Sequence, residues 1–454
     1  MKTYDTLTEE QRKAVLQNDG NALVSASAGS GKTFVMIERV IRLILEGKAD
    51  ADSILAVTYT KLAAEEMKEK LVKAVIAEIN EGGDSERFRK TLAEIPTSDI
   101  STFHSFCANL LRTYFYAAKI DPLFDIADES DAKELQSKAI DRLFESLYEE
   151  KNEDFLSLVR IFRKNRGDAA LKEHVETLYR FAISEKDPAA FLTDGGKTTY
   201  EQTITALTEL QNAKLDALLR EVGLLKKESS SLGLAKLCDH LATVEVSLLS
   251  VIGKTEPKER AFAAGIPLER SPLIKSEDES VLLLKERIKE IKSTIKGLYE
   301  DICSCTDDRT DEENRFRYAK AEETERKLGA LCVRFCEKYA EVKAEENKLD
   351  FSDLEHFAYR LLKENEDVRK SVSEKYDYIF ADEYQDVNGV QEAILNLIAR
   401  DNLFMVGDVK QSIYAFRGCN PDIFAAKFSS YREGSGTAIS LDRNFRSSDG
   451  VLSA

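Results

Sequence analysis

A glycine-rich octet near the N-terminus constrains the fold more than any other part of the sequence. It reads Ala26-Ser27-Ala28-Gly29-Ser30-Gly31-Lys32-Thr33. Glycines let backbone N–H groups turn inward around a polyphosphate, the lysine can reach the β- and γ-phosphates, and the threonine hydroxyl can ligate Mg²⁺. One position departs from the pattern G-x-x-x-x-G-K-[ST], because alanine stands where the first glycine is expected. A chance glycine-rich turn is the alternative.

The flanks of the octet favour the phosphate-binding interpretation. The apolar run 21–25 predicts a buried strand before the loop. After it, apolar residues at helical spacing predict a helix that stops near Gly47. Strand, glycine loop and helix N-terminus, in that order, direct N–H groups and the positive end of the helix at phosphates. We therefore expect a nucleotide site at 26–33, with Lys32 on the phosphates and Thr33 on Mg²⁺.

Composition narrows the class of protein. A chain of 454 residues is too long for one ordinary core, so two or three domains are expected. No apolar run reaches the roughly 18 residues of a membrane span, and no signal-like apolar segment begins the sequence. Seven scattered cysteines, an odd number, favour a reducing compartment. The expectation is a cytoplasmic protein without a membrane partner.

The net charge of −17 argues against a protein that coats nucleic acid generally. It does not exclude a narrow DNA channel, because the local potential in a cleft can differ from the total charge. The acidic residues concentrate away from the octet, around 277–286 and 307–325.

The order of predicted elements indicates an interrupted α/β domain. Strand-like and helix-like segments alternate over 1–113 and again over 345–436, which predicts a parallel sheet with helices on both faces. Between them, 114–344 shows long amphipathic helical patterns and predicts a large, mostly α-helical insertion domain. A further strand is expected at 437–441, as the start of a truncated second domain over 437–454.

A pair of carboxylates, Asp382-Glu383, follows the apolar strand predicted at 376–381. The carboxyl ends of parallel strands are where α/β sheets place ligands. An ATPase needs one carboxylate to hold Mg²⁺ and one to orient and deprotonate the attacking water. We expect Asp382 to serve the metal and Glu383 to serve the water, whereas a solvated loop pair is the alternative.

Several blocks together resemble the motifs of superfamily 1 helicases of the UvrD/Rep/RecB type, and they occur in the family's order. Beside the octet, they are LTEEQRKAV (7–15), AVTYTKLAAEEM (56–67), STFHSFC (101–107), ADEYQD (381–386), VGDVKQSIYAFRG (406–418) and LDRNFRSS (441–448). The block LDFSDLE (349–355) and the form of the fifth block are similar to the AddA branch, whose members work in AddAB helicase–nucleases. The resemblance covers about 1–115 and 345–454, and it implies a RecA-like P-loop NTPase domain that uses ATP and Mg²⁺.

The resemblance also implies roles for single residues in the nucleotide site. Gln11 would recognise adenine and Phe445 would pack on the base. Gln411 would sense the γ-phosphate, since a neutral amide can bond a phosphate or water without adding charge. Arg446 would act as an arginine finger that stabilises charge on the transferring phosphoryl group.

DNA contact is implied for the side chains that match the family's strand-binding positions: Tyr59, Thr60, Thr102, His104, Tyr414 and Phe416. Aromatic rings stack on bases at about 1–3 kcal/mol each without reading sequence, and hydroxyl or imidazole groups can bond phosphates. Phe416 stands where many relatives have tryptophan, so that stacking surface is smaller. Some of these aromatic residues could instead belong to the core.

The expected function is 3′-to-5′ translocation on single-stranded DNA in break repair and recombination, by the N-terminal motor half of an AddA-like helicase–nuclease. An AddB-type subunit, or a chain that supplies the second motor domain, is the expected protein partner. Two alternatives stay open. One is a nucleotide-gated DNA-binding module or remnant without motor activity, and the other is a P-loop NTPase with no nucleic-acid role.

Overall fold

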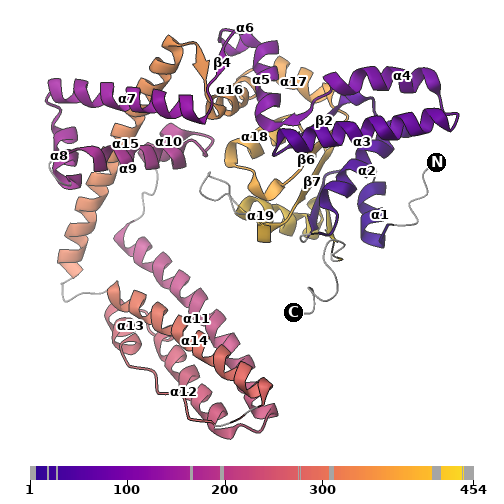
Figure 1. The fold of residues 1–454 in the computed structure, drawn as a ribbon. Coiled ribbons are helices and arrows are strands. Elements are labelled where there is room, and N and C mark those ends of the chain that lie inside the picture. The colour runs from indigo at the N-terminus through magenta and orange to yellow at the C-terminus, as the bar shows by residue number, and fades with distance from the viewer. Residues whose placement is uncertain are drawn as a thin grey trace. The chain divides into compact units, whose positions relative to one another are not determined.

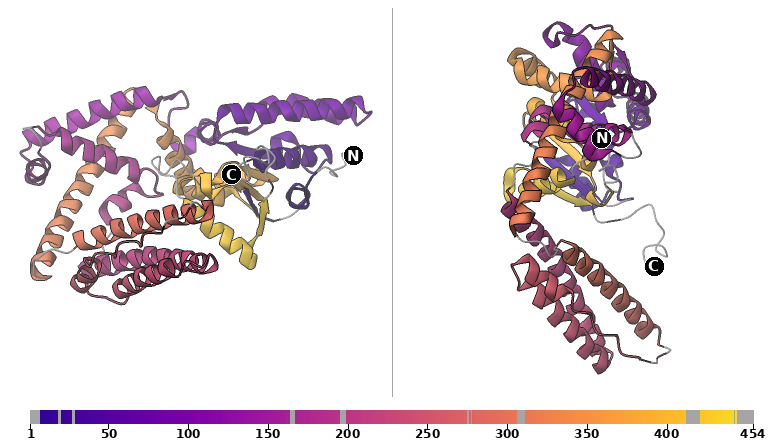
Figure 2. Two further views of the ribbon diagram at one scale, coloured as in Figure 1. Left: turned by 60° about the horizontal axis from the view of Figure 1, so that its bottom comes forward. Right: turned by 90° about the vertical axis from the view of Figure 1, so that its left-hand side faces the viewer.

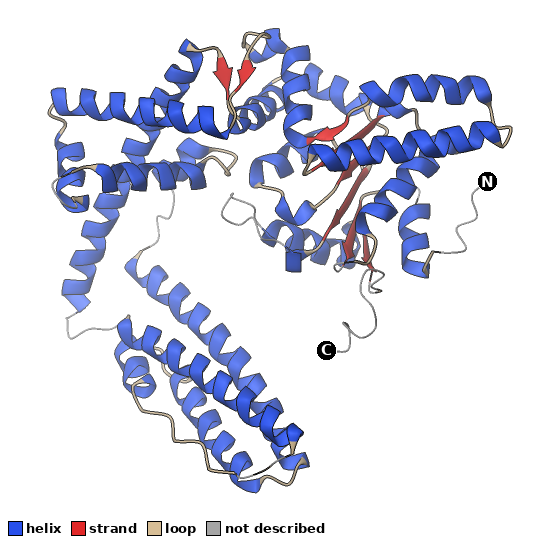
Figure 3. Ribbon diagram, viewed as in Figure 1, coloured by secondary structure: helices blue, strands red, loops and turns tan. Residues whose placement is uncertain are grey.

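The computed structural model describes residues 7–17, 20–26, 29–163, 167–194, 199–274, 276, 278–305, 311–411, 421–441 and 443. The chain divides into two compact units, Met1–Gly195 with Arg326–Ala454, and Gly196–Glu325. Among the described residues, every strand lies in the first unit and the second unit is helical (Figures 1 and 3). The protein is thus a mixed α/β chain with mostly helical content.

The first unit is built on a parallel sheet with strand order β3-β2-β6-β7-β1-β8. Its strands are β1 (Ala22–Ala26), β2 (Ile54–Thr58), β3 (Ile100–Thr102), β6 (Tyr378–Ala381), β7 (Leu403–Gly407) and β8 (Thr437–Leu441). The sequence predicts a strand in each of these places, since the runs 53–59, 98–102 and 402–407 read as strands in addition to 21–25, 376–381 and 437–441. The last of them, β8, is the strand expected to start a second domain. It pairs with β1, with Ala22 opposite Thr437, so it extends the first sheet.

Helices cover both faces of the sheet, because successive residues of a strand point to opposite sides. Leu23 and Ile379 enter one core, whereas the adjacent Val24 and Phe380 enter the other. The core with Leu23 includes helices α5 (Phe103–Thr113), α16 (Phe351–Glu364), α17 (Glu366–Lys375), α18 (Gly389–Ile398) and α19 (Pro421–Ser430). The opposite core includes α1 (Glu9–Leu16), α2 (Lys32–Leu45), α3 (Lys61–Asn80) and α4 (Ser85–Glu94).

A third core of the first unit is formed mainly by helices. It joins α7 (Glu129–Glu149), α8 (Glu153–Phe162), α9 (Ala169–Ala182), α10 (Pro188–Asp194) and the C-terminal part of α15 (Asp311–Glu345). After α5 and the short α6 (Phe115–Ala118), the chain reaches this region through β4 (Asp125–Ile126). It leaves through β5 (Lys348–Leu349), which pairs in parallel with β4. This small sheet ties the two passages together.

The second unit is a helical bundle with its own apolar core. It contains α11 (Tyr200–Ser231), α12 (Ala235–Ile252), α13 (Pro257–Ala264), α14 (Glu279–Ser304) and the start of α15. On α14, buried apolar residues recur every three or four positions, which makes one apolar face. Both views in Figure 2 show α11, α12 and α14 side by side. None of the described helices combines the length and apolarity needed to cross a bilayer.

The compact units differ from the expected domain boundaries. The sequence predicts a helical domain over 114–344, but 114–195 and 326–344 belong to the same unit as the sheet. Amphipathic helical patterns are similar on both sides of residues 195 and 326, so the sequence carries no signal for the division.

Candidate nucleotide site and the adjoining pocket

The glycine-rich octet joins the end of β1 to the first residue of α2. Gly29 and Gly31 have φ values of 76° and 87°, in the left-handed region that favours glycine. A Cβ on Gly31 would also lie 3.2 Å from Gln11 Nε2. Gly31 is the N-cap of α2, so the helix N-terminus opens directly at the loop. Ser27 and Ala28 lie outside the described residues.

The sheet brings the carboxylate pair to this loop. Strands β1 and β6 are parallel and separated only by β7, so their carboxyl ends meet at one edge. Lys32 Nζ lies 3.3 Å from Glu383 Oε2, across 351 residues of sequence. The Thr33 hydroxyl donates to Asp382 Oδ2 at 3.4 Å. The structure therefore places the predicted phosphate and metal residues together.

Asp382 is 8% exposed. Burial, and then the charge of Glu383, raises the pKa of Asp382 to about 6. A hydroxyl and a carboxylate are oxygen ligands of the kind that Mg²⁺ prefers, so Thr33 and Asp382 fit the expected ion. Glu383 adopts a left-handed φ of 49°, which is uncommon for a residue with a side chain and typical of functional sites.

A buried polar network supports these residues. Gln385 Nε2 donates to Glu383 Oε2 at 2.8 Å, and Gln385 Oε1 accepts the backbone N–H of Asp408 at 2.8 Å. The Asp408 carboxylate in turn accepts Gln411 Nε2 at 2.6 Å, and Gln411 Oε1 lies 3.3 Å from Lys32 Nζ. Sequence reasoning missed Gln385 and Asp408. The sequence signal that could have indicated them is a polar side chain shortly after an apolar strand.

Gln11 connects helix α1 to the octet. Its Oε1 accepts the backbone N–H of Thr8, which closes a capping box, and its Nε2 donates to the Ser30 carbonyl at 3.1 Å. The side chain is 5% exposed. The amide therefore holds the loop from behind and retains one Nε2 hydrogen for a further acceptor.

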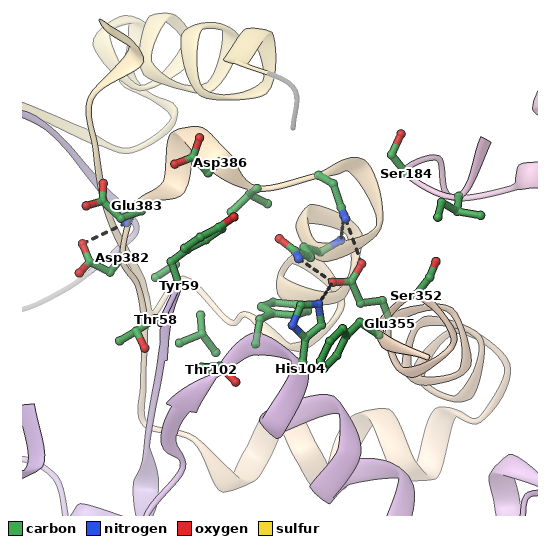
Figure 4. A pocket seen from close by; sticks show the side chains of 18 of the residues that line it. Thr58, Tyr59, Thr102, His104, Ser184, Ser352, Glu355, Asp382, Glu383 and Asp386 are labelled. Carbon is green, nitrogen blue, oxygen red and sulfur yellow. Dashed lines mark hydrogen bonds and ion pairs between the residues drawn. The ribbon is translucent and has the colours of Figure 1, made fainter. Parts of the chain in front are cut away.

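A pocket of about 690 Å³ adjoins the carboxylate pair (Figure 4). Its lining includes Tyr59, Thr102 and His104 of the predicted DNA contacts, and also Asp382 and Glu383. Lys133 and Arg180 add basic side chains to the wall. Sequence reasoning missed them, since they come from helices with no recognised motif.

Two predicted DNA contacts are helix N-caps. Thr60 accepts the N–H of Ala63 at the start of α3, and Thr102 accepts the N–H of Ser105 at the start of α5. Both helices begin at the carboxyl ends of strands β2 and β3. Helix N-termini of this kind attract anions such as phosphates.

The remaining predicted site residues lie outside the described part of the chain. They are Tyr414, Phe416, Phe445 and Arg446. Gln411 is described, at the end of the 3-10 turn Val409–Gln411.

Residues 7–432 match the UvrD/REP helicase N-terminal domain. The chain belongs to the UvrD/REP helicase family. It is 34% identical to the AddA subunits of the ATP-dependent helicase/nucleases of Alkaliphilus oremlandii, Acetivibrio thermocellus and Clostridium novyi, each over 98% of this chain. It spans 38% of the length of these curated relatives. The likeness to the AddA branch of the UvrD/REP helicases thus extends along almost the whole chain.

Proposed function

We propose that this chain is the ATP-hydrolysing, DNA-contacting first part of an AddA-like helicase. The observation that carries the proposal is the meeting of Lys32 and Thr33 with Glu383 and Asp382 at one sheet edge. A cationic side chain, a hydroxyl and two carboxylates at a helix N-terminus are the groups that phosphoryl transfer requires. The match to the UvrD/REP family supports the same reaction.

In the proposed reaction, Lys32 and the loop N–H groups hold the β- and γ-phosphates of ATP. Thr33 and Asp382 would hold Mg²⁺, which would supply charge neutralisation for the phosphates. Glu383 accepts a proton from the attacking water. Gln411 monitors the γ-phosphate. We further assign the adenine edge to Gln11, base packing to Phe445 and the finger role to Arg446.

We propose that the pocket and its rim contact single-stranded DNA through Tyr59, Thr60, Thr102 and His104, with Tyr414 and Phe416 continuing the path. Tyr59 is 38% exposed and can stack on a base. Translocation from 3′ to 5′, a role in double-strand break repair, and an AddB-type partner are part of the same proposal. These activities belong to a complete helicase–nuclease.

We also propose the domain arrangement that would serve this motor. A RecA-like domain of 1–113 and 345–436 carries the nucleotide site, and 114–344 is an insertion within it. Because β8 completes the first sheet, the second motor domain is expected to begin after Leu441 rather than at 437.

ATP turnover by this chain with and without oligo-dT tests the function, with Lys32→Ala as the matched control. We expect Mg²⁺-dependent turnover that single-stranded DNA stimulates and that the control lacks. Turnover indifferent to DNA would indicate an NTPase without a nucleic-acid role. DNA binding that responds to ATP without turnover would indicate a nucleotide-gated binding module.

A further inference from the structure

Glu355 is a buried carboxylate to which sequence reasoning gave no role. It lies on α16 and is 4% exposed. Its Oε1 lies 3.0 Å from His104 Nε2 and accepts Gln391 Nε2 at 2.6 Å. Its Oε2 accepts Asn388 Nδ2 at 2.9 Å. Three elements, α5, α16 and the start of α18, thus converge on one side chain (Figure 4).

The contacts of Glu355 favour its ionised form. Burial by itself opposes the charge, but the bonds from His104, Asn388 and Gln391 outweigh burial and lower the pKa of Glu355. The same negative charge, after burial, helps to raise the pKa of the neighbouring Cys107 thiol. A buried carboxylate needs a compensating cation or full hydrogen bonding. Among these three donors, His104 is the only one that can carry a positive charge.

His104 is partly exposed, so its ring can contact a ligand in the pocket. Its side chain is 39% exposed, it lines the pocket, and its ring lies on Phe351 with centroids 4.7 Å apart. Since Nε2 is held by Glu355, Nδ1 is the remaining polar atom of the ring. Nδ1 and Nε2 both donate only in the protonated imidazole. A carboxylate behind one nitrogen fixes the orientation of the ring and the side from which the other nitrogen can be approached.

We propose that Glu355 is a positioning residue that presents His104 as a hydrogen-bond donor to one backbone phosphate of single-stranded DNA. The inference rests on the proposed DNA role of the pocket. Lys133 and Arg180 are basic side chains of the same pocket, whose wall also carries several carboxylates, and they can contact the neighbouring phosphates of the strand. Asn388 and Gln391 keep the carboxylate in place. Asn388 also caps α18, so the network is fixed at the helix start that follows Asp382-Glu383.

A double-mutant cycle on single-strand affinity tests the inference. Glu355→Gln, His104→Ala and the double variant are titrated with fluorescent oligo-dT. Each single change should weaken binding about tenfold, the size expected for one charge-assisted hydrogen bond. The double variant should be no weaker than His104→Ala, because Glu355 acts through His104.

The outcomes separate this inference from the function on which it rests. Unchanged affinity in His104→Ala would refute the DNA role of His104 itself. Weak binding by His104→Ala with normal binding by Glu355→Gln, or losses that multiply to about a hundredfold, would refute only the role of Glu355. Glu392→Gln is the matched control. Glu392 is another buried glutamate, on α18, bonded to Tyr384, Asn396 and Lys427, and its replacement should leave DNA affinity unchanged.

If Glu355→Gln does not fold, a measurement on the unsubstituted chain can still test the proposal. In ¹⁵N-histidine NMR, the His104 signal is identified by its loss in His104→Gln. We expect a proton on Nε2 in the free protein and protons on both nitrogens once oligo-dT is bound. A neutral ring with its proton on Nδ1 would overturn the proposal.

Discussion

Lys32 lies between Glu383 and Gln411, 3.3 Å from an oxygen of each, and is 9% exposed. Without a nucleotide, its ammonium is neutralised by the carboxylate that we assign to the attacking water. Phosphates bound in the octet would compete for Lys32 and release Glu383. Binding of ATP would therefore also free the Glu383 carboxylate to act as the base. The ion pair between Lys32 and Glu383 thus links phosphate binding to activation of the water.

Glu383→Gln separates the two functions. The amide keeps the size and an oxygen for Lys32 but cannot take a proton, so hydrolysis should fall at least about 100-fold. Affinity for Mg-nucleotide should stay within about threefold. Single-turnover hydrolysis and titration with a fluorescent ATP analogue measure the two effects. Loss of binding would instead identify Glu383 as a metal ligand.

A second buried cluster has one cation for two carboxylates. Lys343 Nζ lies 3.0 Å from Asp350 and 2.5 Å from Asp353. Burial, and then the charge of Asp350, raises the pKa of Asp353 to about 6. Burial also opposes ionisation of Asp350, but Lys343 and further hydrogen bonds lower its pKa. The block LDFSDLE thus contains a structural charge cluster beside the positioning residue Glu355.

Asp353→Asn should stabilise the protein at neutral pH. The folded pKa of about 6 exceeds the usual aspartate value of 3.8. The stability that protonated Asp353 contributes is therefore complete below pH 4 and lost as the pH rises through 6. The neutral amide should gain about 1–3 kcal/mol at pH 7.5 and only about a third as much at pH 4.5. Urea unfolding at both pH values measures this. The pKa of Asp350 is lowered rather than raised, so the variant Asp350→Asn should be less stable than the unsubstituted protein at pH 7.5.

At the level of elements, short-range patterns predicted the strands well. The run at 21–25 became Ala22–Ala26, and the runs near 54, 378 and 403 became buried strands. Apolar β-branched residues next to turn residues suffice for that. The pairing partner of β8 was not predictable, because an apolar strand at 437–441 could pair with β1 or with strands of a following domain. The two-residue strands β4 and β5 were missed, since each is too short to show alternation.

Helix packing gives a prediction at this scale. Gly329 lies on α15 where the backbone of α10 passes closely, and a Cβ there would overlap the Leu192 carbonyl oxygen. Gly329→Ala should therefore cost about 1–3 kcal/mol, despite the better helix propensity of alanine. Gly297→Ala on α14 is the control. Nothing lies within 4 Å of its Cβ position, so it should gain about 1 kcal/mol. Equal urea midpoints for the two variants would contradict the packing argument.

At the scale of the whole molecule, the sequence predicted one sheet domain interrupted by helices, and motif chemistry predicted which strand ends would meet. Lys32 and Glu383 could be paired because each belongs to a motif with a chemical task. Glu355 could not be paired with His104 in this way, because its importance comes from buried hydrogen bonds that no local pattern shows. The division at residues 195 and 326 likewise depends on which helices share a core.

The second unit should fold without the rest of the chain. Among the described residues, its buried apolar core comes from α11 to α14. A polypeptide of residues 199–305 should show helical circular dichroism and one cooperative urea transition. Leu248→Ala, at a fully buried site, should cost about 2–5 kcal/mol, whereas Leu283→Ala, 61% exposed, should cost little. A non-cooperative transition would show that this unit needs its neighbours.

The position of β1 in the sheet has a consequence for biosynthesis. Both of its neighbours, β7 and β8, come from the last part of the chain, beginning at Leu403. At roughly 5–20 residues per second, a ribosome needs roughly 20–75 s to reach β7 after completing β1. During that time the octet has no sheet beneath it, and β1 is an unpaired apolar strand of the kind that chaperones protect. The proposed ATP site can thus form only after β7 and β8 have emerged from the ribosome, long after the octet itself has been made.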